Sequence, residues 1–196
     1  MSTKLVSFTT PQGVAQYPYL STPDTKFSEE GDYKVNLILS KEEAAPIISQ
    51  IDEVMKDNLE TIKKEKKKSN IKQANLPYFN EEKDDEETGN VVIKFKSKGA
   101  YKPAIFDAKG TPMLDSNIWA GSEIKVNAAI APFYTAMVGA GISLRLRAVQ
   151  VIQYVEGSSG AGRFGFEEEA GFVTEPKKEI VADEPVATNT AEDEDF

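Results

Sequence analysis

Three lysines occupy every second position between residues 94 and 98, and they alternate with Ile93, Phe95 and Ser97. In an extended chain, alternate side chains point to opposite faces, so Lys94, Lys96 and Lys98 would stand in a row while Ile93 and Phe95 pack inward. Three like charges at this spacing repel one another and require an anion to offset them. A phosphate backbone is such an anion, and the pattern therefore favours nucleic-acid binding. The alternative is a solvated lysine edge that discourages strand-to-strand aggregation.

Aromatic and basic residues follow the lysine row directly. Tyr101, Lys102 and Phe106 continue the mixture of rings and cations, which is what a single-stranded nucleic acid needs. Cations contact its phosphates, while each ring that stacks on a base contributes roughly 1–3 kcal/mol. Trp119, in contrast, lies in an apolar segment and is predicted to belong to the core rather than to a stacking surface.

Two arginines near the end of the apolar sequence offer further phosphate contacts. Arg145 and Arg147 alternate with the isoleucine and leucines of residues 142–146, so a strand here would hold both guanidinium groups outward. The competing interpretation pairs them with Glu123 or Glu156 as surface ion pairs.

Several classes of chemistry are excluded by composition. The chain has neither cysteine nor histidine, which rules out disulfides, thiolate metal sites, imidazole bases and histidine-ligated zinc. Residues 160–165 match the spacing G-x-G-x-x-G, but no helix follows and the glutamates at 167–169 would repel a pyrophosphate. Only Asp107, Asp115 and Glu123 stand where a magnesium-dependent nuclease would need carboxylates. We therefore predict no catalytic residue, no cofactor and no metal.

The negative charge of the chain is concentrated at its end. Residues 167–196 contain 11 of the 32 acids and two lysines, a net charge of −9, so the preceding 166 residues sum to zero. Such a segment cannot bury enough apolar surface to fold. It could instead compete with a polyanion for the cationic residues of 88–166. The partner-binding residues predicted in it are the terminal acids and the last aromatic: Glu192, Asp193, Glu194, Asp195 and Phe196.

The elements that must position these residues are mostly strands. Hydrophobic alternation predicts strands over 4–8, 14–20, 33–39, 91–97, 101–106, 122–130 and 142–155, with a bulge near 148–150. One amphipathic helix interrupts them. It begins after Ser40, where Ser40 and Glu43 form a capping box, or alternatively at Pro46. Residues 69–90 are expected to form a mobile acidic loop.

These elements predict a mainly β domain, a small closed or partly closed barrel with one helix. We place the domain at 1–156 and a glycine-rich linker with a flexible acidic tail at 157–196. No apolar run reaches the roughly 20 residues that span a bilayer, and the first residues lead into a strand pattern rather than a signal peptide. We expect a soluble intracellular protein without membrane contact.

In several segments the sequence resembles the replication single-stranded DNA-binding proteins of short-tailed bacteriophages. The segments that carry the resemblance lie at 33–37, 92–96, 118–122, 144–150 and 193–196, and they span most of the chain. The resemblance implies an antiparallel OB-fold barrel and sequence-tolerant binding of single-stranded DNA. It also implies a homodimer, and recruitment of a phage DNA polymerase and a primase-helicase by the tail. The lysines between residues 63 and 68, near the end of the predicted helix, and the acidic residues 81–87 do not map onto the family pattern.

The resulting hypothesis places single-stranded DNA in a groove formed by 91–106 and 141–155, in the cytoplasm of the infected host. The tail would occupy that groove when DNA is absent, and replication, recombination and repair would be the processes served. Two other classes remain open. A protein-interaction or scaffolding module with a solubilising tail predicts no DNA affinity, and an enzyme is disfavoured by the missing histidine and cysteine.

Overall fold

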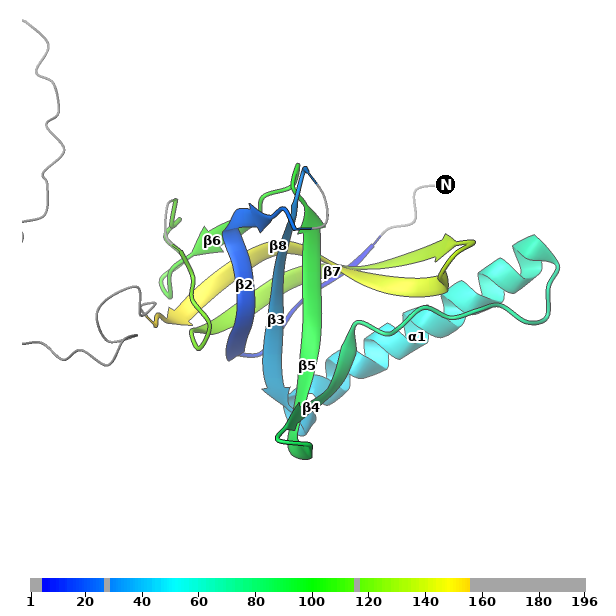
Figure 1. Cartoon of the computed structure of the whole chain (residues 1–196), viewed down its shortest axis with the longest axis horizontal. Helices are drawn as coiled ribbons and strands as arrows, with labels where there is room; N and C mark the ends of the chain where they lie inside the picture. Colours follow the sequence, from blue (N-terminus) through cyan, green and yellow to red (C-terminus); the bar gives the residue numbers. More distant parts are fainter. Residues whose placement is uncertain (1–4, 27–28, 115–116, 156–196) are drawn as a thin grey trace, which may run out of the picture.

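The computed structural model describes residues 5–26, 29–114 and 117–155. In this part of the chain, one long helix runs beside a strongly curved sheet (Figure 1). The order of strands, helix and strands is the predicted one. The elements are β1 (Val6–Thr9), β2 (Gly13–Asp24), β3 (Asp32–Ser40), α1 (Lys41–Lys66), β4 (Tyr78–Lys83), β5 (Glu86–Lys98), β6 (Ala104–Phe106), β7 (Glu123–Thr135) and β8 (Gly139–Gln153).

Five of the strands pair into a ring. β2 pairs antiparallel with β3, β3 with β5, and β7 with β8. Two short seams complete the ring: β5 meets β8 in parallel at Lys96 and Arg145, and β2 meets β7 at Gly13 and Val14. The other strands add to its edges, β1 on β7, β4 on β5 and β6 on β8. This is the mainly β, barrel-like architecture with one helix that the sequence predicts.

Alternating apolar residues fill the inside of the ring. Val35, Leu37 and Leu39 of β3 are buried, as are Ile93 and Phe95 of the neighbouring strand β5. Burying a side chain of this size contributes about 1.5–3 kcal/mol, and a slip of one residue would turn the whole set toward solvent. The core therefore fixes which face of β5 lies outside.

The helix begins where the capping box predicts. The Oγ of Ser40 accepts a hydrogen bond from the Glu43 N–H at 3.3 Å, and the Ser40 N–H donates to the Glu43 carboxylate at 3.4 Å. The first helical residue is Lys41, so the alternative start at Pro46 is wrong. A proline at this position costs one intrahelical hydrogen bond, and the cap offsets that loss.

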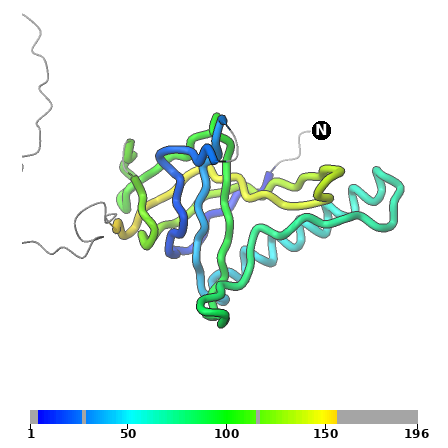
Figure 2. The backbone as a smooth tube through the Cα atoms, in the orientation of Figure 1, coloured from blue at the N-terminus to red at the C-terminus, as the bar shows by residue number. Residues whose placement is uncertain are grey.

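The second half of α1 runs beside the hairpin of β7 and β8, which extends beyond the ring (Figure 2). Asn58 connects the two: its side-chain amide donates to the carbonyls of Phe133 at 3.1 Å and Gly141 at 3.2 Å. One apolar stripe of the helix, spaced as predicted, faces the sheet. Its buried members are Ala44, Ile47, Ile51, Met55 and Ile62.

The expectation of a mobile acidic loop over 69–90 is wrong. Residues 78–90 belong to a β-hairpin in which β4 and the start of β5 pair antiparallel. Its turn residues Asp84 and Asp85 have φ angles of 54° and 65°, typical of the two-residue turn that matches strand twist. The segment before it is also held, since the Ala74 N–H donates to the Ala140 carbonyl at 2.7 Å. Backbone pairing outweighs the polarity of the side chains, which point into water.

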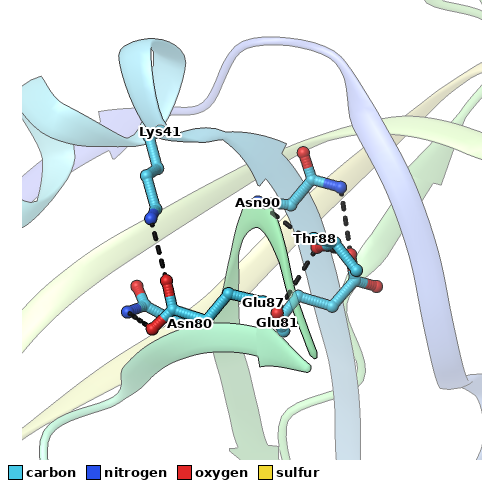
Figure 3. Close-up of polar contacts among 6 residues, drawn as sticks. All are labelled: Lys41, Asn80, Glu81, Glu87, Thr88 and Asn90. Carbon is cyan, nitrogen blue, oxygen red and sulfur yellow. Dashed lines mark hydrogen bonds and ion pairs between the residues drawn. The ribbon is translucent and has the colours of Figure 1, made fainter. Parts of the chain in front are cut away.

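Two acids of this hairpin are held by hydrogen bonds (Figure 3). Glu87 accepts from the ammonium group of Lys41 on α1 at 3.2 Å. Glu81 accepts from the Thr88 hydroxyl at 2.6 Å and from the Asn90 amide at 3.0 Å. These donors favour the charged form, so the pKa of Glu87, chiefly through Lys41, and that of Glu81, chiefly through Thr88, lie below the usual value.

Other expectations need smaller corrections. The strand expected over 101–106 is only β6, because residues 99–103 turn away from the sheet. The bulge lies at Arg147 rather than at 148–150, since Asn127 pairs with Ala148 while the next residue of β7 pairs with Leu146. Within the described residues, no helix is both long and apolar enough to cross a bilayer. The predicted tail at 157–196 lies outside them, and the domain boundary stays a prediction.

Candidate nucleic-acid interface

The lysine row of β5 lies on the outer face of the ring, as predicted. Lys94, Lys96 and Lys98 are exposed, whereas Ile93 and Phe95 between them are at most 1 % exposed. Because β5 is held on both sides by neighbouring strands, its backbone fixes where each lysine side chain starts. The three ammonium groups therefore extend from one strand that is held in place by a neighbouring strand on each side.

Pairing between strands extends this row sideways. Lys96 lies opposite Lys34 of β3 and, on its other side, opposite Arg145 of β8. Lys34 in turn lies opposite Tyr19 of β2. A line of three cations ending in an aromatic ring thus crosses four strands. We call five outward cations of β3, β5 and β8, the paired line and its neighbours on β5, the cationic band: Lys34, Lys94, Lys96, Lys98 and Arg145.

The band is largely unneutralised by the protein itself. In the described part of the chain there are two ion pairs, and the only band member in either is Lys34, which pairs with Asp24. The hydrogen bond from Lys34 is the main reason that the pKa of Asp24 lies below its ordinary value. Neither Arg145 nor Arg147 forms an ion pair there, so the competing interpretation, a pairing with Glu123, is not found. Its other partner, Glu156, lies outside the described residues.

Aromatic rings accompany the band. The ammonium nitrogen of Lys34 lies 4.9 Å from the ring centroid of Tyr19, and that of Lys94 lies 4.6 Å from the centroid of Phe79 on β4. Cations over ring faces are attracted by about 0.5–1 kcal/mol at exposed sites. Tyr19 and Phe79 are 42 % and 43 % exposed, so each ring retains a surface for an incoming base.

Of the predicted stacking residues, Tyr101 lies close to the band. Its ring is 70 % exposed, and its N–H donates to the Lys98 carbonyl at 2.8 Å in the loop after β5. The same loop carries Lys102, also exposed. It touches the turn before β3, because the Gly99 N–H donates to the Gly31 carbonyl at 2.9 Å. A Cβ at Gly99 would lie 1.9 Å from a carbonyl oxygen of that turn, which explains the glycine.

Phe106 and Arg147 lie on a neighbouring surface, not within the band. Phe106 is half-buried on β6 and lines a hollow of about 330 Å³ with Lys125, Asn127 and Gln150. Arg147 donates to the Ser7 hydroxyl of β1 at 2.8 Å. The structure thus gathers Lys94, Lys96, Lys98 and Arg145 on one face with Tyr101 and Lys102 at its end. Arg147 follows two residues after Arg145 on β8, and Phe106 lies on β6, which pairs with β8.

The comparison with protein families decides what kind of protein this is. The model of the single-stranded DNA-binding protein of bacteriophage T7 matches residues 12–154. The chain belongs to this family. It is a family of binding proteins rather than enzymes, which confirms the resemblance seen in the sequence and the prediction of a non-enzyme.

Solved structures similar to this member of the T7 family share its fold. Gp2.5, a single-stranded DNA-binding protein encoded by bacteriophage T7, is 23 % identical with a TM-score of 0.67, over 88 % of this chain and 100 % of that one. The single-stranded DNA-binding protein of bacteriophage Enc34 is 19 % identical with a TM-score of 0.57, over 80 % and 86 %. The structure of the Enc34 protein in complex with single-stranded DNA is 20 % identical with a TM-score of 0.58, over 76 % of this chain and 88 % of that one. A comparison with curated proteins gives no match.

Sequence reasoning missed several candidate interface residues of this T7-family chain. Lys34 was visible as the polar position of an alternating strand, but nothing in the sequence says that β3 lies beside β5. Tyr19 and Phe79 were hidden for the same reason. Trp119 was expected in the core and is 40 % exposed, because the preceding Ile118 occupies the buried position.

A second basic surface lies at the far end of α1. Its lysines, the helix-end cluster, are Lys63, Lys64, Lys66, Lys67 and Lys68, all exposed. Lys66 lies over the ring of Tyr134 on β7, 5.4 Å from its centroid, and Lys72 donates to the Met137 carbonyl at 3.0 Å. Residues 192–196, the predicted partner-binding end of the tail, lie outside the described residues.

Proposed function

We propose that this chain binds single-stranded DNA without strong sequence preference, with the cationic band as the phosphate-binding surface. The single observation that carries the assignment is the line of Lys34, Lys96 and Arg145 across three paired strands, in a chain of the T7 single-stranded DNA-binding family. A duplex is stiff, whereas a single strand follows the curvature of such a surface. Phosphates and ring faces are common to all nucleotides, so contacts to them read no sequence.

The roles follow from position. Lys94, Lys96, Lys98, Lys102 and Arg145 would contact phosphates, and Tyr101 would stack on a base where the strand passes the end of β5. Arg147 and Phe106 would continue the path around β8 and β6 past the hollow beside Lys125. Binding residues on strands are more rigidly placed than residues on loops, which lowers the entropy lost on binding.

The test is the salt dependence of binding. For the double variant Lys94→Ala/Lys96→Ala, we expect weaker binding of fluorescent oligo-dT and a log–log salt slope reduced by roughly 0.7 for each lost phosphate contact. The matched control is Lys56→Ala/Lys83→Ala, which removes two exposed lysines outside the band. An unaltered slope in the band variant would place the interface elsewhere. No affinity of the wild type at about 100–200 mM salt would favour the protein-interaction module instead.

The tail adds a proposed regulatory role. Residues 167–196 carry a net charge of −9, opposite in sign to the band, so they would compete with DNA for it and be released when DNA binds. Once released, the terminal acids and Phe196 would contact basic surfaces of a phage DNA polymerase and a primase-helicase. Solubility alone gives no reason for an aromatic at that position.

Deletion of residues 176–196 tests this role. We expect tighter binding of oligo-dT and weaker binding of the partner enzymes, because both a competitor and a docking segment are lost. Unchanged or weaker DNA binding would contradict competition. Removal of Phe196 alone should weaken partner binding and leave DNA binding close to wild type, since the acids remain.

Three further properties belong to the proposal. The chain would form a homodimer, it would act in the cytoplasm of the infected host, and it would serve replication, recombination and repair. Sedimentation of the full chain and of the deletion variant tests whether a dimer forms and whether the tail supports it. A monomer in both cases would remove the dimer from the proposal without affecting DNA binding.

A further inference from the structure

The strand β2 carries a strained bulge beside the cationic band. Gln16 pairs with Asn36 and Tyr19 with Lys34, so three steps along β2 match two along β3 and one residue is extra. Within this bulge Tyr17 has a φ of 49°, a left-handed conformation that is costly for a bulky side chain. Strain of this kind clusters at functional sites.

The bulge opens a hollow on the outer surface. The hollow has a volume of about 210 Å³ and is lined by residues 18–22 of β2 on one side and 117–119 on the other. A water molecule occupies about 30 Å³ in the liquid, so a ring-sized group can enter. Leu20 and Ile118 are buried beneath it, while the rings of Tyr19 and Trp119 are 42 % and 40 % exposed.

Hydrogen bonds join the segment before β7 to β2 next to the hollow. The Ala15 N–H donates to the Ser122 carbonyl at 2.8 Å, and the Gly121 N–H donates back to the Ala15 carbonyl at 2.9 Å. The Tyr154 hydroxyl donates to the Asn117 carbonyl at 3.2 Å. Residues on both sides of Trp119 are therefore hydrogen-bonded, to β2 and to Tyr154 directly after β8, which holds the Trp119 side of the hollow in place.

The chemistry of the lining suits a neutral, flat ligand. Among the described residues, no lysine, arginine, aspartate or glutamate lines the hollow, and the polar groups of its lining are hydroxyls and one amide. An ion has no counter-charge here. A nucleobase, in contrast, has an apolar face for the rings and donors and acceptors at its edge.

The hollow also lies at the end of the line formed by Arg145, Lys96 and Lys34. Tyr19 is one of its walls and is at the same time the ring under the ammonium group of Lys34. Lys34 leads through Lys96 to Arg145. A strand whose phosphates follow this line would bring a base to Tyr19.

We propose that this hollow binds one unpaired nucleobase, stacked against Tyr19 and Trp119. The inference rests on the proposed DNA binding and goes beyond it, because it assigns base contacts to β2 and the segment before β7. The residues expected from the sequence to stack, Tyr101 and Phe106, lie elsewhere. Tyr17, exposed at the strained position, directly precedes the lining residue Pro18 and would cover the next base.

The experiment uses the single tryptophan of the chain as a reporter. Oligo-dT added to the wild type should quench the emission of Trp119, because stacking on a base quenches indole fluorescence. An oligonucleotide of the same length with abasic sites should bind through its phosphates and leave the emission nearly unchanged.

Affinity provides the second readout. The variant Trp119→Leu should bind oligo-dT about fivefold or more weakly, as expected for loss of one stacked base, and bind the abasic oligonucleotide like the wild type. Tyr134→Leu, which removes an equally exposed ring on the β7–β8 hairpin, is the matched control and should bind both normally.

The outcomes separate this inference from the proposed function. If oligo-dT binds but the emission of Trp119 does not change, or if Trp119→Leu binds both oligonucleotides like the wild type, the base site is wrong and DNA binding stands. An equal loss for both oligonucleotides would show a structural role only. If the wild type binds neither oligonucleotide, the proposed function itself fails. The quenching measurement needs no variant, so it remains decisive if Trp119→Leu does not fold.

Discussion

The cationic band and the helix-end cluster are both rich in lysine, yet their surroundings differ. The band extends from strands paired on both sides, and its side chains point from one face. Successive residues of a helix are rotated by about 100°, and the chain leaves the helix after Lys66. The five lysines of 63–68 therefore surround the end of α1 rather than line one path. The band also has rings beside it on β2 and β4, whereas the cluster has Tyr134.

This difference teaches that the number of lysines does not define a nucleic-acid surface. Lysines near a helix C-terminus are stabilised by the helix dipole, and here they keep the C-terminal end of α1 solvated. Lysines on a central strand face gain nothing comparable and repel one another. The second arrangement is the one that an extended polyanion relieves.

The largest effect expected is on DNA affinity after charge reversal. Lys96→Glu/Lys98→Glu should lower the affinity for oligo-dT on the order of a hundredfold near 100 mM salt, because attractive phosphate contacts become repulsive. Lys63→Glu/Lys64→Glu should change it by about twofold at most and instead lower stability slightly, through the helix dipole. Fluorescence anisotropy and thermal unfolding measure the two quantities. Comparable losses of affinity in both variants would break the distinction between the surfaces.

A second prediction concerns what holds the helix end in place. Asn58→Ala removes the two hydrogen bonds to the carbonyls of Phe133 and Gly141, and should lower the free energy of unfolding by about 1–3 kcal/mol. Affinity for oligo-dT should stay near wild type, because neither Asn58 nor the two residues whose carbonyls it contacts belong to the band. Urea denaturation tests this, with the exposed Lys56→Ala as control. A large loss of DNA affinity at unchanged stability would assign the helix end to the interface.

A third prediction sharpens the band itself. The Asp24 carboxylate forms an ion pair with the ammonium group of Lys34, so it competes with an incoming phosphate for that group. Asp24→Asn should raise the affinity for oligo-dT by about twofold and increase the salt slope toward one further contact, roughly 0.7. Asp57→Asn on the exposed side of α1 is the control. Weaker binding by Asp24→Asn would show that the carboxylate positions Lys34 rather than competes with the phosphate.

The smallest effect concerns the contact between β4 and α1. Tyr78 of β4 donates to the Asp52 carboxylate of α1 at 2.7 Å, and burial followed by this bond raises its pKa to about 12. The folded pKa exceeds the unfolded value near 10, so the contribution is fully present below pH 10 and is lost as pH rises toward about 12. Tyr78→Phe should remove that part of the pH dependence in denaturation experiments. An identical pH dependence in both proteins would contradict the assignment.

Much of the fold was accessible from local patterns. The alternation in residues 33–39 and 91–97 predicted two strands and their inward faces, and the Ser40–Glu43 capping box predicted the helix start. These signals work because burial and capping act on neighbours in sequence. The hairpin at 78–90 was missed because its side chains are acidic and exposed, while the interaction that forms it is backbone pairing.

The sequence by itself determined that Lys94, Lys96 and Lys98 share one outward face, that histidine and cysteine chemistry is impossible, and that the negative charge lies in the last thirty residues. Only the tertiary structure decided what stands beside the lysines. The register of β2, β3, β5 and β8 brings Tyr19, Lys34 and Arg145 into line with Lys96. Strand pairing joins residues more than a hundred positions apart, and such partners are chosen by the packing of the whole core, which no local pattern records.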